Sequence, residues 1–166
     1  LVAALAISDS FKELFELTVD IKWPNDIQVV GKKISGILPD LVSTDLTLEM
    51  YLGIGINIKT PSDLPEEVSA IATSIEKLGL EPPSRERLLA NLSFFLETRL
   101  MQAKIDSANL ILDWKSQLVT LGKRIRLATP GEDVTGLAVG ELVLELEDGS
   151  RSSYMAGDVH TLRIED

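Results

Sequence analysis

The sequence predicts an α+β fold in two parts, and three observations lead to that prediction. Residues 1–117 combine helical apolar spacing with extended, alternating segments. From Gly122 onward only short extended stretches separated by turn residues remain. The 166-residue chain has 45% hydrophobic and 25% charged residues, as ordinary globular proteins do. We therefore expect a mixed domain over residues 1–117 and a small β-barrel module over residues 118–166.

The chain opens with a predicted amphipathic helix. Ile7, Phe11, Leu14 and Phe15 recur at helical spacing, so they share one stripe that faces a core. The apolar run over residues 1–7 has no basic residues before it and is too short to span a bilayer. It is therefore interpreted as part of a core helix and not as a signal or membrane segment.

Extended structure is predicted next, over residues 18–38 and 47–58. Gly31 and Lys32 lie between two apolar stretches, which predicts a tight hairpin there. In the second segment strict alternation predicts a half-buried strand. Its apolar face carries Leu48, Met50, Leu52, Ile54, Ile56 and Ile58, and its other face ends in Gly53, Gly55 and Asn57.

Helices are predicted for the following section. Apolar spacing from Val68 to Leu78 predicts a helix that stops at Gly79. Ser84 can cap a helix whose stripe is Leu88, Leu92, Phe95 and Leu96. Asp106 or Ser107 can cap one more helix, which ends near Gln117. Beyond it, turn signals separate predicted strands over residues 123–128, 134–139, 141–147 and 150–155.

Composition excludes several classes of function. The net charge is −10 and no Lys/Arg cluster is present, which argues against binding to nucleic acid. Without cysteine there is neither a disulfide framework nor a thiolate zinc site. The single histidine, His160, excludes a multi-histidine metal site within one chain, so no protein metal site is predicted.

Three short strings carry the chemistry: Ile21-Lys22-Trp23-Pro24-Asn25-Asp26, Ser35-Gly36-Ile37-Leu38 and Gly53-Ile54-Gly55-Ile56-Asn57. By residue type alone, Lys22 is either a solvated lysine or a cation placed against an oxygen that gains negative charge. The glycines either form a bare floor for a ligand or mark bulges and close sheet packing. Asn57 is either a ligand contact or an asparagine that ends a strand before a turn.

In this order and spacing the three strings resemble the second half of the catalytic domain of biotin protein ligases, the biotin–[acetyl-CoA-carboxylase] ligase family. The resemblance extends over essentially all 166 residues. It implies part of a class II synthetase-like catalytic domain followed by an SH3-like barrel. The implied reaction uses biotin and MgATP to make biotinyl-5′-adenylate, and then transfers biotin to a lysine of a carrier protein. A cytoplasmic location, a biotin carboxyl carrier domain as partner and a possible homodimer are further expectations, with no nucleic acid or membrane contacts through this part.

The resemblance also implies roles for particular residues. Lys22 would contact biotin and the acyl-adenylate as the catalytic cation. The pocket for biotin would include Gly36, Ile37, Gly53 and Gly55, and the nucleotide would be held by Asn57, Asp158 and Arg163. One departure is that Pro39-Asp40 stands where the family usually has Glu two residues after Gly-Ile-Leu, so the carboxylate is kept on a shorter side chain.

The family's arginine- and glycine-rich nucleotide loop is expected upstream of Leu1, so the chain is expected to be part of a protein. The activity of the isolated chain is left open for the same reason. Two alternatives remain. The chain can be a non-catalytic half or assembly subunit completed by a second polypeptide, or a lipoate ligase relative with the same catalytic fold. The Lys-Trp-Pro-Asn-Asp string and the C-terminal barrel favour biotin.

Overall fold

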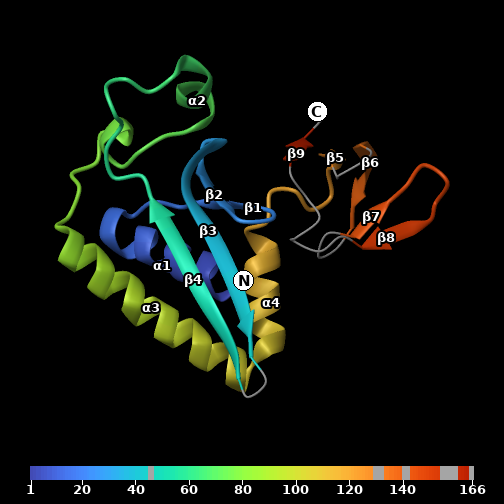
Figure 1. Cartoon of the computed structure of the whole chain (residues 1–166), viewed down its shortest axis with the longest axis horizontal. Helices are drawn as coiled ribbons and strands as arrows, with labels where there is room; N and C mark the ends of the chain where they lie inside the picture. The colour runs from blue at the N-terminus through green and yellow to red at the C-terminus, as the bar shows by residue number, and fades with distance from the viewer. Residues whose placement is uncertain (45–46, 129–132, 140–142, 154–160, 165–166) are drawn as a thin grey trace. The chain divides into compact units, whose positions relative to one another are not determined.

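The structure is a computed structural model that describes residues 1–44, 47–128, 133–139, 143–153 and 161–164. Its backbone forms two compact units, one of residues 1–21 with 25–117 and the other of residues 22–24 with 118–166. The first unit mixes helices and an antiparallel sheet, and the second is built of short strands (Figure 1). The predicted α+β class is confirmed.

The first unit begins with α1 (Val2–Phe15), as predicted. Ile7 and Phe11 of the predicted stripe are fully buried, while Leu14 and Phe15 are only half-buried. The helix ends at Glu16, which has left-handed dihedral angles and donates its N–H to the carbonyl of Lys12. Burial of this apolar stripe is what ties α1 to the unit.

A four-stranded sheet follows in the order β1 (Asp20–Lys22), β2 (Asp26–Val29), β3 (Lys32–Ser43), β4 (Leu48–Ile56). The hairpin between β2 and β3 turns at Val30 and Gly31, which have φ of 49° and 73°. The prediction of a turn at Gly31-Lys32 was therefore wrong by one residue. A two-residue turn matches the twist of its strands when both of its residues have positive φ, as Val30 and Gly31 do. Lys32 is already the first residue of β3 and is not part of the turn.

The β3–β4 ribbon is the longest feature of this sheet (Figure 1). Residues facing each other across it include Gly36 with Gly55 and Ile37 with Ile54. The prediction that β4 is half-buried was wrong for its first half, where Leu48 and Met50 are two-thirds exposed. Alternation placed these side chains on one face correctly, but no described element covers that end of the ribbon.

The helix predicted between Val68 and Gly79 is broken into α2 (Glu66–Ile71) and a 3₁₀ turn, η1 (Glu76–Leu78). The break is at Ala72, whose dihedral angles are extended and which bridges to Lys33 of β3. Thr73 then donates its N–H to the carbonyl of Lys33 over 2.8 Å. Pairing with the sheet therefore outweighs the apolar helical spacing.

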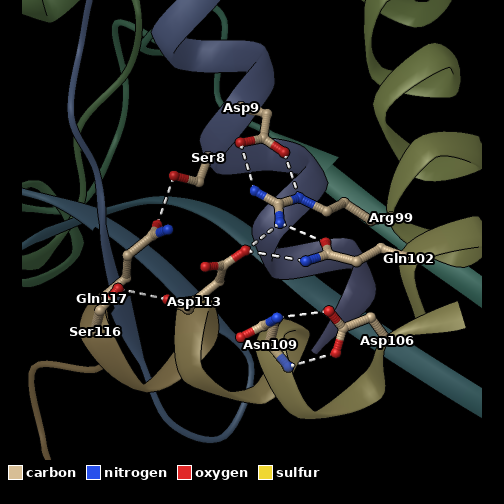
Figure 2. Close-up of polar contacts among 9 residues, drawn as sticks. All are labelled: Ser8, Asp9, Arg99, Gln102, Asp106, Asn109, Asp113, Ser116 and Gln117. Carbon is tan, nitrogen blue, oxygen red and sulfur yellow. Dashed lines mark hydrogen bonds and ion pairs between the residues drawn. The ribbon is translucent and has the colours of Figure 1, made fainter.

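Two helices complete the unit: α3 (Arg85–Ile105) and α4 (Ser107–Ser116). Ser84 and Asp106 cap them, each accepting the N–H of the residue three positions on. Arg99 of α3 joins the three helices, because it bonds Asp9 of α1 through two nitrogens and Asp113 of α4 through a third (Figure 2). Both predicted caps are confirmed.

The second unit contains one antiparallel sheet in the order β8-β7-β6-β5-β9. Its strands are β5 (Arg124–Ala128), β6 (Asp133–Ala138), β7 (Val143–Glu145), β8 (Arg151–Ser153) and β9 (Thr161–Ile164). Ile125 and Leu144 are fully buried, and Gly136 allows β6 and β7 to approach closely. The predicted strands are present: β5 starts one residue later than predicted, β6 has the predicted length shifted by one residue, and β7 and β8 lie within the predicted ranges, parts of which fall outside the described residues.

Candidate functional site

Lys22 is the last residue of β1, directly before the stiff pair Trp23-Pro24, whose peptide bond is cis. The N–H of Ile21 donates to the carbonyl of Gln117 over 2.9 Å, and this fixes the strand. The Lys22 side chain is half-buried, and within the described residues its ammonium has no hydrogen-bond or ion-pair partner. It is thus available to a ligand, but no described contact directs it towards one.

Three glycines form an open strip of backbone on one face of the β3–β4 ribbon. Gly36 faces Gly55, and Gly53 faces Leu38, so the glycines alternate onto the same side. A methyl group added at Gly55 would meet nothing closer than 4.0 Å. The strip is therefore open for a ligand at Gly55, while Leu38 lies beside Gly53 and the Lys33 side chain lies beside Gly36.

Ile37 lies between these positions but its side chain points to the opposite face, because neighbouring residues of a strand alternate. Its N–H donates to the carbonyl of Asn25 over 2.8 Å. The structure thus separates the Ile37 side chain from the glycine strip. Only the backbone of Ile37 is near that strip.

The cation on the glycine strip is Lys33, which the sequence analysis did not select. Its Nζ lies 2.5 Å from Asp26 Oδ1, and a Cβ at Gly36 would be 3.1 Å from both Cε and Nζ of Lys33. The pair register shifts between Ile27 and Gln28, so that Lys33 faces Gln28 while Ser35 faces Ile27. This bulge brings Lys33 to the face that carries Asp26 and Gly36.

Simple alternation would have placed Lys33 on the other face, three residues before Gly36. The sequence carried only a weak sign of this: Lys32 and Lys33 are adjacent in a strand after a glycine turn, so their side chains must point to opposite faces. Next to it, Ser35 is buried and its hydroxyl oxygen has no hydrogen-bond partner in the described part of the chain. The neighbourhood of Gly36 therefore holds a partly buried ion pair on one face of the sheet and an unsatisfied hydroxyl on the other.

Asn57 follows β4 and is an exposed residue tied into the loop behind it. Its side-chain amide donates to the carbonyl of Thr73 over 3.0 Å, and its own carbonyl accepts the N–H of Ile75. These contacts fit both the interpretation as a ligand contact and the interpretation as a residue that ends a strand. The amide nitrogen binds backbone carbonyls of the neighbouring loop and strand, whereas the amide oxygen accepts no hydrogen bond within the described region.

A cavity of about 870 Å³ opens beside Asn57, within the first unit. Its walls come from the end of β4, the loop to Ser74 and the start of α3. Apolar residues such as Ile56 and Val68 line it together with the charged residues Lys59, Arg85 and Glu81. This size and mixture suit a small organic ligand that has both apolar and charged groups.

The remaining two predicted contacts are in the second unit. Asp158 lies outside the described residues, as does His160. Arg163 is in β9, where its backbone pairs with Arg126 of β5. The grouping of Asn57, Asp158 and Arg163 in one nucleotide site therefore stays a prediction.

Comparisons with known proteins point to one family. Residues 1–57 match the family model described as the biotin/lipoate A/B protein ligase family, and residues 120–160 match the biotin protein ligase C-terminal domain. The chain belongs to the biotin protein ligase family. It is 35% identical, over 98% of its length, to a protein named "Biotin--[acetyl-CoA-carboxylase] ligase" from Mycobacterium tuberculosis. It is 32% identical over 94% of its length to the "Bifunctional ligase/repressor BirA" of Bacillus subtilis.

Solved structures of the family are also similar. The biotin protein ligase of Aquifex aeolicus in complex with biotin and ATP superposes with a TM-score of 0.81 and 26% identity, covering 99% of this chain and 70% of that one. The chain spans 62% of the length of the Mycobacterium relative and 50% of that of the Bacillus relative. Similarity to this family of ligases thus covers nearly all of this chain but only part of its relatives.

Two negative findings apply to the described ranges. No helix there is long and apolar enough to cross a membrane. Nor do three or more His, Cys, Asp or Glu side chains come together in those ranges as a group that could hold a metal ion.

Proposed function

We propose that this chain contributes to a biotin protein ligase that makes biotinyl-5′-adenylate and passes biotin to a carrier protein. In the first step a carboxylate oxygen of biotin attacks the α-phosphorus of ATP and pyrophosphate leaves. In the second step the amine of a carrier lysine attacks the acyl carbon, loses a proton and releases AMP. The observation that carries the proposal is the glycine strip of Gly36, Gly53 and Gly55 with a lysine ammonium over it, in a chain of this family.

The work of the protein in such a reaction is placement and electrostatic stabilisation. Both reacting groups are anionic, so a cation between them lowers their repulsion and stabilises the charge that grows at phosphorus. Lys22 is the candidate from the motif, and Lys33 is the candidate from the geometry, because its Nζ already lies over the glycine strip. Asp26 holds Lys33 there through an ion pair.

The nucleotide is proposed to lie near Asn57, in or beside the cavity that Lys59 and Arg85 line. Those cations suit phosphate oxygens, and the apolar wall suits a base. Arg163 and Asp158 are proposed to contribute from the C-terminal domain. Because the described residues offer no group of three metal-ligating side chains, they do not by themselves fit Mg²⁺. The ion is proposed to arrive with the phosphates of ATP.

The proposed protein partner is a biotin carboxyl carrier domain, and the proposed location is the cytoplasm. The carrier domain is supported by the name of the Mycobacterium relative, which includes acetyl-CoA-carboxylase. The domain limits 1–117 and 118–166 are part of the same proposal, supported by the C-terminal family match over residues 120–160. A homodimer is proposed as well.

A second candidate function is that of a half-ligase or assembly subunit completed by another polypeptide. Two observations favour it: the chain spans 62% of one relative's length, and large apolar side chains of β4 and α3 are exposed, including Leu48, Met50, Phe94 and Ile105. A lipoate ligase is less favoured, because residues 120–160 match a domain described for biotin protein ligases.

The test is pyrophosphate release from ATP with biotin, measured for the chain alone and with an N-terminal ligase fragment from a relative. We expect release only with the fragment, and no release when lipoate replaces biotin. Release with lipoate but not with biotin would refute the proposed substrate. No release with either acid, although the fragment binds, would favour the assembly subunit.

Three matched variants then identify the cation: Lys22→Met, Lys33→Met and Lys32→Met. Loss of one preorganised charge-assisted donor slows a reaction by about a hundredfold or more. We expect that loss for Lys33→Met and for Lys22→Met, while Lys32→Met, directly after the turn, behaves as the unchanged chain. Equal, small effects of all three would show that neither lysine contacts the reacting oxygens.

A further inference from the structure

The chain leaves the first unit at two places, and these two places are bonded to each other. It leaves after Ile21 and again after Gln117, and the N–H of Ile21 donates to the carbonyl oxygen of Gln117 over 2.9 Å. Ile21 is the middle residue of β1 and directly precedes Lys22, the lysine of the Lys-Trp-Pro-Asn-Asp string. The carbonyl of Gln117 therefore holds β1 at the residue next to that lysine.

β1 depends on this bond because the strand is short. It has three residues, of which only Ile21 is buried. Side chains alternate along a strand, so the buried Ile21 turns Lys22 to the opposite face. A slip of one residue would exchange the two faces. The direction of the Lys22 side chain thus depends on the contacts that keep Ile21 in place.

Gln117 is itself held from α1. Its side-chain oxygen Oε1 accepts the hydroxyl of Ser8 over 2.6 Å (Figure 2). This bond is partly buried and joins residues 109 positions apart. The N–H of Gln117 donates to the carbonyl of Trp114 in the last turn of α4. One residue thus contacts three elements: α1 through its side chain, α4 through its N–H and β1 through its carbonyl.

We propose that Gln117 is a positioning residue for Lys22, and that Ser8 is the side chain through which α1 fixes it. The bond to Ser8 orients Gln117, the carbonyl of Gln117 holds Ile21, and Ile21 sets the direction of Lys22. This rests on the proposed function, in which Lys22 is a cation that stabilises the anionic reaction centre. It adds two residues outside the motif that act on the reaction rate only through Lys22.

The first test follows the amide proton of Ile21 by hydrogen exchange in the full chain. Loss of one such hydrogen bond changes a local equilibrium by about twofold to tenfold, so Gln117→Met and Ser8→Ala should each speed exchange at Ile21 by about that factor. Gln117→Glu should keep the slow exchange, because a carboxylate oxygen also accepts the Ser8 hydroxyl. The matched control is Ser116→Ala, which removes a bond of the same 2.6 Å length to the carbonyl of Asp113 within α4. It should leave exchange at Ile21 unchanged.

The second test measures pyrophosphate release by the full chain supplemented with the N-terminal ligase fragment. Misplacing a reacting group by about 1 Å costs up to about a hundredfold in rate, so we expect Gln117→Met to lower kcat by about tenfold and to leave KM for ATP within about twofold. Gln117→Glu should restore kcat. In a chain that carries Lys22→Met, Gln117→Met should lower kcat no further, because its effect passes through Lys22. A general structural role of Gln117 would lower the rate by the same factor with and without Lys22.

The outcomes separate the positioning role of Gln117 from the proposed function. If Lys22→Met lowers kcat and Gln117→Met does not, only the positioning role is overturned. It is also overturned if Gln117→Met costs as much in the Lys22→Met chain as in the unchanged one, or if exchange at Ile21 stays slow in both Gln117→Met and Ser8→Ala. If Lys22→Met itself has no effect, Lys22 is not the cation of the proposed function, and the positioning role fails with it.

Discussion

Arg99 holds three helices of the first unit together, so its removal should lower stability by a predictable amount. Its guanidinium lies 2.6 Å from Asp9 Oδ2 and 2.6 Å from Asp113 Oδ2 (Figure 2). The Arg99 side chain is 15% exposed, Asp9 is 25% exposed and Asp113 is 45% exposed. These contacts join α3 to α1, which is far away in the sequence, and to α4, which follows α3 directly, so their loss affects the packing of all three helices.

The magnitude follows from burial. Removing one partner of a fully buried ion pair costs about 3–5 kcal/mol, whereas an exposed pair contributes about 0.2–1 kcal/mol. The two-bond contact with Asp9 lies between these limits at about 2–3 kcal/mol, and the more exposed Asp113 adds roughly 0.5 kcal/mol. We therefore expect Arg99→Met, which keeps the aliphatic contacts, to lower the free energy of unfolding by about 3 kcal/mol.

The assay is urea unfolding followed by the far-ultraviolet circular dichroism of the helices. A loss of this size moves the midpoint down by roughly 1–2 M urea. The control is Arg87→Met on the exposed side of the same helix, which should stay within about 0.5 kcal/mol of the unchanged chain. In a double-mutant cycle, Asp9→Asn should cost little once Arg99 is gone. An effect of Arg99→Met no larger than that of Arg87→Met would refute this account of the contact.

Three further predictions concern pH, close packing and capping. The hydrogen bond from Arg99, and then that from Gln102, lower the pKa of Asp113 below its usual 3.8. A carboxyl whose pKa is lowered by folding stabilises the folded state at pH values above its pKa in the unfolded chain, and this stabilisation is lost as pH falls below about 4. The free energy of unfolding measured against pH should therefore fall less steeply below about pH 4 in Arg99→Met than in the unchanged chain. In the second unit, Gly136→Ala would place a methyl 2.7 Å from the carbonyl oxygen of Glu145, so thermal unfolding of that unit should show a loss of about 1–3 kcal/mol. Ser84→Ala removes the cap of α3, and urea unfolding should show a loss of about 1 kcal/mol.

Local patterns were enough to predict most elements of the first unit. The stripe of Ile7 and Phe11 predicts α1, and Ser84 and Asp106 mark the starts of α3 and α4. The alternation after residue 47 predicts β4 and places Gly53 and Gly55 on one face. These predictions succeed because capping and periodicity depend on residues within a few positions of each other.

Tertiary pairing decided what local patterns could not. Ala72 is extended because it bridges to Lys33, so the helix predicted there is interrupted. The exposure of Leu48 and Met50 depends on which elements cover the ribbon, and alternation carries no information about that.

The candidate site shows the same division. The sequence alone determined the family resemblance and the shared face of Gly53 and Gly55, because a motif and a strand's alternation both depend only on the order of residues. The pairing of β3 with β4 then placed Gly36 opposite Gly55. Only the tertiary structure placed Lys33 over Gly36. A single-residue shift in the pairing of β2 with β3 reverses the face to which a side chain points, and such a shift is set by contact between strands and not by the order of residues in either one.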